Sequence, residues 1–241
     1  MLPPFTMNAW LRFDGIRRAI SGAGPHSVLE IGVGEGASAT WIAPRFDYLG
    51  VEQDDRSRAL AQARLGRVGR GRIVADLDDV PDARFDMVCA FEVLEHIADD
   101  VAALSEWRAR LNAGGHALLS VPAHADQFGP HDELVGHYRR YDRDELVVKL
   151  EKAGFAVVRL TSHGVGLGQV LEWGRNQLAR RRELAPTLEQ RTAASGRLLQ
   201  PHSAVSLAAC AALAAPFRVL QAPFASRDLG TGYVALARML P

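Results

Sequence analysis

Three glycines at alternate positions, Gly32, Gly34 and Gly36, follow an apolar run and precede an amphipathic stretch. Glycine suits a turn in which the backbone takes positive φ and approaches a ligand closely. A helix that begins after such a turn, at about Ala37, presents free N–H groups and a partial positive charge, which favours an anion. The spacing also satisfies the dinucleotide fingerprint, so the glycine loop by itself leaves the ligand open.

Acidic residues near this loop distinguish between the candidate ligands. Glu30 lies two positions before Gly32, where it would repel a diphosphate and attract an ammonium group. Glu52 ends the next apolar run, where it would accept from a pair of ribose hydroxyls, and Asp76 ends the third, where it would accept from an adenine amino group. A ligand with an ammonium group, a carboxylate, a ribose and an adenine, but no phosphate, fits this set. We therefore predict S-adenosylmethionine as the cofactor.

A strand that leads into a short acidic turn and a helix is predicted at FDMVCAFEVLEHI, residues 85–97. Within it, Glu95 and His96 follow Glu92 by three and four positions, so the three side chains share one helical face. Together with a later histidine they would form a divalent-metal site of oxygen and nitrogen ligands. The sequence by itself leaves open whether these side chains bind a metal.

Residues 121–146 concentrate histidines, tyrosines and arginines in a loop punctuated by glycine and proline. Loops at this edge of a sheet carry substrate contacts more often than they carry packing. The candidate catalytic residues are His131, His137 and Tyr138, with one of the histidines as base or orienter.

The same segment offers candidate contacts to the acceptor, at Arg139, Arg140 and Tyr141. An arginine can hold an anionic group of the acceptor through a bidentate pair. The structural alternative is that Asp132 and Asp142 pair with the arginines and that Tyr141 caps a helix.

Short apolar runs that alternate with amphipathic stretches position these residues, a pattern typical of βα units around a parallel sheet. The predicted strands cover residues 27–31, 48–52, 72–75, 86–91, 116–121 and 156–160, and a terminal run at 232–237 is expected to return as an antiparallel seventh strand. The predicted core helices cover residues 8–20, 37–43, 57–65, 99–111 and 143–153. Helical stretches at 167–184, 188–199 and 204–217 would form an insertion between strands six and seven.

We therefore expect an α/β protein with a Rossmann-like, doubly wound sheet of seven mostly parallel strands. Residues 1–241 would form a single domain. Its parts would be an N-terminal helical segment (1–25), a cofactor-binding core (26–164), a helical insertion or lid (165–225) and a terminal strand (226–241).

The ordered motifs resemble those of class I S-adenosylmethionine-dependent methyltransferases that act on small molecules, over about residues 26–160 and the terminal strand. By this resemblance the cofactor-binding residues are Glu30, Gly32, Gly34, Gly36, Glu52, Gln53, Asp76, Leu77, Phe91, Glu92 and His96. Some quinone- and RNA-modifying relatives use a Glu-x-x-Glu-His set to bind magnesium. In metal-free relatives the acid and the histidine instead fasten the turn or contact the methyl donor.

The charge composition limits the classes of partner that this chain can be expected to bind. Lys plus Arg and Asp plus Glu each number 28, so the net charge of zero argues against nucleic acid as a bulk partner. The balance is uneven, because residues 1–130 carry 13 basic and 18 acidic side chains and residues 131–241 carry 15 and 10, which favours an anionic acceptor. Cys89 and Cys210 lie far apart in apolar surroundings, as expected of free thiols in the cytoplasm.

The longest apolar stretch, residues 204–217, has 14 residues, whereas a membrane-spanning helix needs about 20. We expect a core or interfacial helix and no transmembrane segment. A homodimer that uses this helix is a further expectation.

The predicted function is transfer of a methyl group from S-adenosylmethionine, which leaves S-adenosylhomocysteine, to an oxygen of a small or peptide-sized, anionic metabolite. Nitrogen and carbon are alternative acceptor atoms. A quinone or lipid-like acceptor is an alternative within the family, and a non-catalytic, cofactor-binding regulatory protein is an alternative outside it. We also expect a cytoplasmic enzyme, and one of bacterial secondary metabolism.

Overall fold

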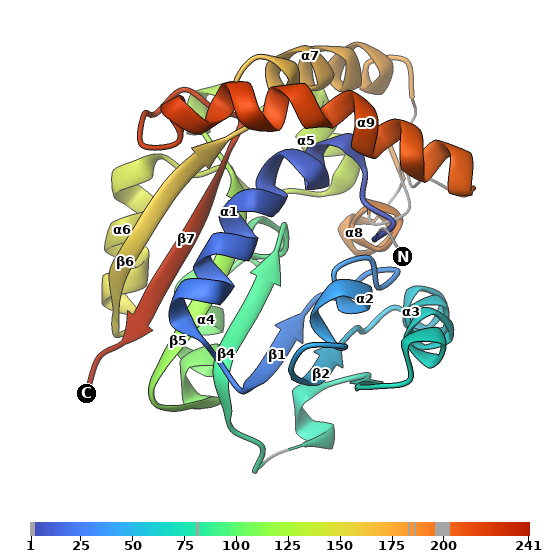
Figure 1. Ribbon diagram of the computed structural model, residues 1–241. Coiled ribbons are helices and arrows are strands. Elements are labelled where there is room, and N and C mark those ends of the chain that lie inside the picture. Colours follow the sequence, from blue (N-terminus) through green and yellow to red (C-terminus); the bar gives the residue numbers. More distant parts are fainter. Residues whose placement is uncertain (1–2, 81, 183, 186, 196–202) are drawn as a thin grey trace.

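The computed structural model describes residues 3–80, 82–182, 184–185, 187–195 and 203–241. A single seven-stranded sheet lies at the centre of this part of the chain (Figure 1). Its strands are β1 (Ser27–Ile31), β2 (Asp47–Val51), β3 (Arg72–Val74), β4 (Phe85–Phe91), β5 (Leu111–Pro122), β6 (Phe155–His163) and β7 (Gly232–Met239).

The strand order is β3-β2-β1-β4-β5-β7-β6. Neighbours from β3 to β5 pair in parallel, whereas β7 is inserted antiparallel between β5 and β6. This arrangement confirms the predicted sheet, with its antiparallel last strand.

Helices cover both faces of the sheet and bury two apolar clusters. On one face α1 (Met7–Ala23) packs over β5, β6 and β7, and α2 (Ala39–Ile42) and α3 (Asp55–Val68) lie together over the β1–β3 side. On the other, α4 (Asp100–Ala109) and α6 (Arg143–Lys152) enclose the larger cluster around Trp107 and Phe155. The carboxyl ends of the parallel strands are thereby left free to carry a site.

The predicted helical insertion between strands six and seven is confirmed. It contains α7 (Leu167–Ala179), α8 (Leu188–Ser195) and α9 (Ala204–Gln221), and both α7 and α9 run along the top of Figure 1. Residues 196–199, where the helix predicted at 188–199 would end, lie outside the described residues.

Two local predictions need correction. The fifth strand begins at Leu111 and passes through Gly114 and Gly115, which we expected to precede it, because a register shift against β4 accommodates the extra residues. Part of the expected loop at 121–146 is helical, as α5 (Pro130–Val135). Pro130 suits the first turn of a helix, and the Asp132 carboxylate accepts from the Gly129 N–H, so this helix begins where a loop was predicted.

The apolar stretch at 204–217 is longer and more exposed than expected. With the following turn it forms an apolar segment, Val205–Phe224, of 20 residues, of which 11% is buried. Its length and composition would allow it to cross a membrane, and it is the one such helix among the described residues. Of the two expected alternatives, a core or an interfacial helix, the core helix is wrong, because only the face turned toward α1 is covered, and the interfacial helix stays a prediction.

Candidate functional site

A cavity of about 1050 Å³ opens at the carboxyl ends of β1, β2, β4 and β5. That volume is at the upper end of the range typical of small-molecule sites, so the cavity can hold a cofactor together with an acceptor. Side chains from α1, α7, α8 and α9 complete its walls, which places the helical insertion over the strand ends.

The glycine loop adopts the backbone conformation predicted for it. Gly32, Gly34 and Gly36 have φ of 68°, 57° and 83°, in the left-handed region that favours glycine. A Cβ at Gly32 would lie 2.5 Å from a Val93 methyl, whereas a Cβ at Gly34 would meet nothing within 4 Å. Gly34 therefore leaves open space at the cavity wall, where a ligand can approach the backbone.

The Glu30 carboxylate is buried at the end of β1 and lies on the cavity. It accepts hydrogen bonds from the Ser38 hydroxyl and, at 2.8 Å, from the Tyr48 hydroxyl. Burial raises the pKa of Glu30 to about 7, because desolvation penalises the charged form more than these two donors stabilise it. A cationic group bound in the cavity would lower this pKa again and so restore the negative charge of the Glu30 carboxylate.

At the end of β2, Glu52 is held by two backbone donors. Its carboxylate oxygens accept from the Gly34 N–H at 2.7 Å and from the Asp54 N–H at 3.0 Å. Two bonds leave part of the carboxylate's acceptor capacity free, and both Glu52 and Gln53 lie on the cavity. The glycine loop and Glu52, the predicted ribose contact, are thus joined by a hydrogen bond.

The predicted adenine contacts lie at the periphery. Asp76 is exposed and caps the short turn that follows β3, where its side chain accepts from the Asp78 N–H and, at 3.4 Å, from Gln53. Leu77 is buried in the core. Neither residue is among those that line the cavity, so Gln53 connects Asp76 to it.

Phe91 and Glu92 lie on the cavity where β4 ends. Glu92 has a φ of 59°, which is unusual outside glycine and typical of residues held under strain at a functional site. Its carboxylate accepts from the Ser120 hydroxyl at 2.9 Å and lies 3.6 Å from the Arg12 guanidinium.

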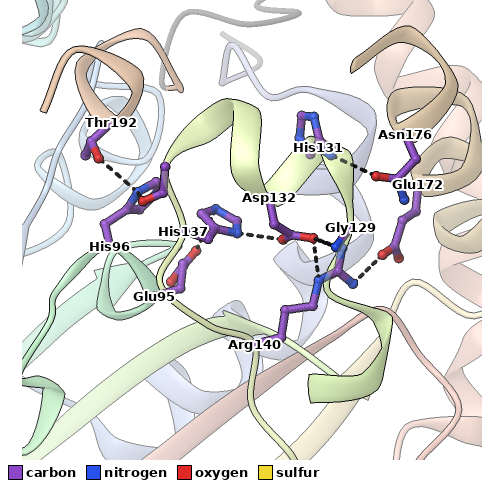
Figure 2. A network of polar contacts seen from close by, with 11 residues as sticks. Glu95, His96, Gly129, His131, Asp132, His137, Arg140, Glu172, Asn176 and Thr192 are labelled. Carbon is purple, nitrogen blue, oxygen red and sulfur yellow. Dashed lines mark hydrogen bonds and ion pairs between the residues drawn. The ribbon is translucent and has the colours of Figure 1, made fainter. Parts of the chain in front are cut away.

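Glu95, His96 and His137 form a compact cluster beside Glu92 (Figure 2). Their candidate ligand atoms lie within 4.8 Å of one another, and both oxygens of the fully buried Glu95 lack a hydrogen-bond partner. Burial and the charge of Glu92 raise the pKa of Glu95 well above its usual range. A carboxylate and two imidazoles form a donor set that suits a divalent cation, so the residues fit a metal.

His137 belongs equally to a second network, centred on Asp132 of α5 (Figure 2). One Asp132 oxygen lies 2.7 Å from His137 Nδ1, and the other accepts from Arg140 at 2.9 Å. The other nitrogen, Nε2, lies 3.8 Å from the Glu95 carboxylate. Because the bonds from His137 and Arg140 outweigh burial, the pKa of Asp132 is held well below its usual range, so Asp132 is an anion that accepts the Nδ1 proton.

His131 and Tyr138 also lie on the cavity. Burial and the nearby Arg175 charge lower the pKa of His131 to about 4, which makes it a weak base at neutral pH. Tyr138 is largely exposed at the cavity rim.

Three acceptor contacts predicted from the sequence are engaged elsewhere. Arg140 is 4% exposed and forms ion pairs with Asp132 and Glu172, whereas Arg139 forms an ion pair with Asp100 at 2.6 Å. Tyr141 is fully buried, and its hydroxyl donates to Asp100 at 3.0 Å. Each of these side chains has an internal partner, and of the three only Arg140 is among the residues that line the cavity, so an acceptor-binding role for them stays a prediction.

The cavity residues that the sequence analysis did not name include Arg12 of α1, His163 of β6 and Arg175 of α7. The Arg175 guanidinium donates to the Asn8 side-chain oxygen at 2.8 Å when that amide is oriented to accept, and its buried Nε has no partner. Both arginines occur in amphipathic helices remote from the motifs, so the sequence holds no local sign of their role.

Comparison with known proteins identifies relatives. Residues 11–160 match the family model described as a methyltransferase domain. A protein of Mycolicibacterium smegmatis, named a probable S-adenosylmethionine-dependent methyltransferase, is 33% identical over 171 residues, which cover 68% of this chain and 66% of that protein. A ubiquinone biosynthesis O-methyltransferase of Alkalilimnicola ehrlichii is 30% identical over 119 residues, which cover 46% of this chain and 47% of that protein. The matched regions thus span from about half to just under two thirds of these relatives.

Among solved structures, an S-adenosylmethionine-dependent methyltransferase from Mesorhizobium loti superposes with a TM-score of 0.59 over 96% of this chain and 99% of that one. The two sequences are 16% identical, so this likeness concerns the fold alone.

Proposed function

Since this chain belongs to the class I S-adenosylmethionine-dependent methyltransferases, we propose that it transfers a methyl group from that cofactor to an oxygen of a small acceptor bound in the cavity. When bound, the cofactor supplies an electrophilic methyl group on a sulfonium sulfur. The protein has to bind both molecules, align them and take up a proton from the acceptor.

The cofactor would lie along the glycine loop. The open backbone at Gly34 gives room for close approach, the buried Glu30 suits an ammonium group, and Glu52 has acceptor capacity left for ribose hydroxyls. Gln53 and Phe91 would flank the remainder, and a contact of Asp76 or Leu77 with adenine would have to come from the rim.

The observation that carries the acceptor chemistry is the pair of His137 and Asp132. Asp132 accepts at Nδ1, so Nε2 of the neutral imidazole keeps its lone pair, and His137 lies on the cavity. A base held in this way can take the proton of an acceptor hydroxyl as the oxygen is methylated. His131, with a pKa near 4, is the weaker candidate, and Tyr138 would contact the acceptor at the rim.

An anionic acceptor would be held by Arg175 rather than by Arg139 or Arg140. Among the described residues Arg175 has no ion-pair partner within 4.0 Å, and its Nε is buried without an acceptor. A carboxylate or phosphate oxygen of the acceptor would supply the missing bond.

A divalent metal at Glu95, His96 and His137 is the second use that this cluster supports, on the evidence of the two partnerless Glu95 oxygens. A bound ion would polarise the acceptor oxygen and favour its deprotonation. A quinone-like acceptor is the corresponding alternative substrate, since one relative is named a ubiquinone biosynthesis O-methyltransferase.

Cytoplasmic location, a role in bacterial secondary metabolism and a homodimer stay predictions.

The proposed activity is tested by titrating the protein with S-adenosylmethionine and with NADH, and then by following S-adenosylhomocysteine formation with acceptor libraries. We expect binding of the first ligand only, and Glu52→Ala should weaken it about 5- to 150-fold, since unsatisfied donors cost about 1–3 kcal/mol. Tight binding of NADH alone would refute the proposal, and cofactor binding without product for any acceptor would indicate a regulatory protein.

A further inference from the structure

The outer face of α9 is apolar and uncovered. Val205 is 80% exposed and Val219 74%, and Leu213 and Leu220 are also exposed. Between Ser203 and Ser226 the sequence holds one charged residue, Arg218. A monomeric protein rarely leaves so long an apolar helix face in water, so this face indicates an interaction surface.

The opposite side of α9 is anchored to the protein. Arg218 forms a two-pronged ion pair with Asp14 of α1, at 2.7 and 2.8 Å. Gln221 bonds to the Leu11 carbonyl at 2.6 Å and accepts from the Gly164 N–H at 2.8 Å. A helix that spanned a bilayer would have to give up these bonds, whereas a helix that lies on a surface keeps them.

The first turns of α7 lie against the segment that links α9 to β7, because Gln169 bonds to the carbonyl of Leu229 in that segment. There α7 exposes Val170 and Trp173, the latter to 67%. Tryptophan is favoured where an apolar phase meets water. We call the exposed side chains Val170, Trp173, Val205, Leu213, Val219 and Leu220 the cap face.

Positive charge accompanies the cap face. Arg180, Arg181 and Arg182 follow α7 and are exposed, and no ion pair joins them to another described residue. Within α7 and α9 the single acid is Glu172, which is buried and paired with Arg140. An apolar surface with exposed arginines is complementary to an anionic lipid surface.

We propose that the cap face docks on the surface of a bilayer that contains anionic lipid, with α9 lying in the interface plane. A second copy of this chain fits the charges less well. A twofold contact through the cap face would offer these arginines no acid from α7 or α9, because Glu172 is already paired with Arg140.

Docking would bring the cavity close to the membrane, because Leu171 and Arg175 of α7 and Cys210 of α9 line the cavity from the inner side of the same helices. A lipid-phase acceptor could then reach the site with a short path through water. The docking itself does not depend on the proposed methyl transfer, and it can be measured without turnover.

The test is flotation of the full chain with vesicles of phosphatidylcholine alone or mixed with phosphatidylglycerol. We expect binding to the mixed vesicles that weakens with added salt and is much lower on phosphatidylcholine alone. Leu213→Glu with Val219→Glu should reduce binding at least tenfold, and replacing Arg180, Arg181 and Arg182 by Gln should reduce it roughly fivefold per arginine. Val148→Glu, at an exposed valine of α6, is the matched control and should bind as the unchanged protein does.

Three outcomes would overturn the proposal. The first is absence of the protein from vesicles of either composition. The second is equal binding to both, which would exclude recognition of anionic lipid. The third is a dimer in sedimentation that the Leu213→Glu and Val219→Glu variant dissociates, which would make the cap face a contact between copies. Circular dichroism of each variant verifies that the loss is not one of folding.

Discussion

His137 and Asp132 form a dyad in which the carboxylate lies 2.7 Å from Nδ1, while the other imidazole nitrogen lies 3.8 Å from the buried Glu95 carboxylate. The His137 side chain lines the cavity. Arg140 holds the second Asp132 oxygen, so the carboxylate cannot rotate away from the imidazole without losing an ion pair. The dyad thereby determines which nitrogen of His137 is available as a base.

Replacing His137 by Ala should lower kcat by about 10²- to 10⁴-fold, the usual contribution of a positioned general base. The affinity for S-adenosylmethionine should change little, because the proposed role of His137 is on the acceptor, whereas the proposed cofactor contacts are at Glu30, Gly34 and Glu52. Product formation and calorimetric titration of the cofactor measure the two effects. His26→Ala, at an exposed histidine, is the control. Equal losses of cofactor affinity and turnover would assign His137 a structural role.

Glu30 predicts a pH dependence of cofactor binding. The pKa of Glu30 in the folded protein is about 7, so below that pH the Glu30 carboxyl of the cofactor-free protein is protonated. Binding of an ammonium group beside it must then release this proton. Affinity should therefore rise as pH increases toward 7 and level off above it. Calorimetry in two buffers of different ionisation enthalpy measures the released proton, and Glu30→Gln should abolish it. A proton release that persists in this variant would contradict the assignment.

The same residue affects stability with a definite sign. The pKa of Glu30 is raised on folding from 4.5 to about 7, so across this range the folded state holds a proton that the unfolded state has lost. Stability should fall as pH rises from about 4.5 to 7, by about 3 kcal/mol from this group. Urea unfolding of the protein and of Glu30→Gln at both pH values isolates the contribution. A difference of the opposite sign would contradict it.

Arg139 and Arg140 should behave differently although they are adjacent. Replacing Arg140 by Ala leaves Asp132 and Glu172 buried without their shared cation and should cost about 3–5 kcal/mol of unfolding free energy. Arg139→Ala breaks a more exposed pair and should cost less than about 1 kcal/mol, because Lys149 still pairs with Asp100. Denaturant unfolding of both variants tests this contrast, and equal costs would argue against it.

Removal of metal ions by a chelator distinguishes the two proposed roles of the cluster of Glu95, His96 and His137, a general base at His137 or a metal site. If His137 acts as a base, EDTA should leave turnover within about twofold, and Glu95→Gln should retain activity. Loss of turnover on chelation, restored by Mg²⁺ or Mn²⁺ in the unchanged protein but not in Glu95→Gln, would instead assign Glu95, His96 and His137 to a metal. Calorimetric titration with Mn²⁺ gives a second measure that does not require an acceptor.

The sequence by itself determined the sheet, the glycine loop and the acids at the strand ends. These features depend on short-range patterns, in which apolar runs form strands, Gly32 and Gly34 take conformations that other residues avoid, and Glu52 follows directly on its strand. The parallel arrangement then brings these residues to one edge of the sheet without any knowledge of their contacts.

Only the tertiary structure decided which charged side chains face the cavity and which partners they have. Arg139 and Arg140 look alike in the sequence, yet Arg139 pairs with Asp100 away from the cavity, whereas Arg140 lies on the cavity and pairs with Asp132 and Glu172. Arg175 reaches the cavity from a helix in the insertion. The partner of a charged side chain is set by the packing of segments far apart in the chain, because burying a charge is costly unless an opposite charge or a hydrogen bond is there to meet it.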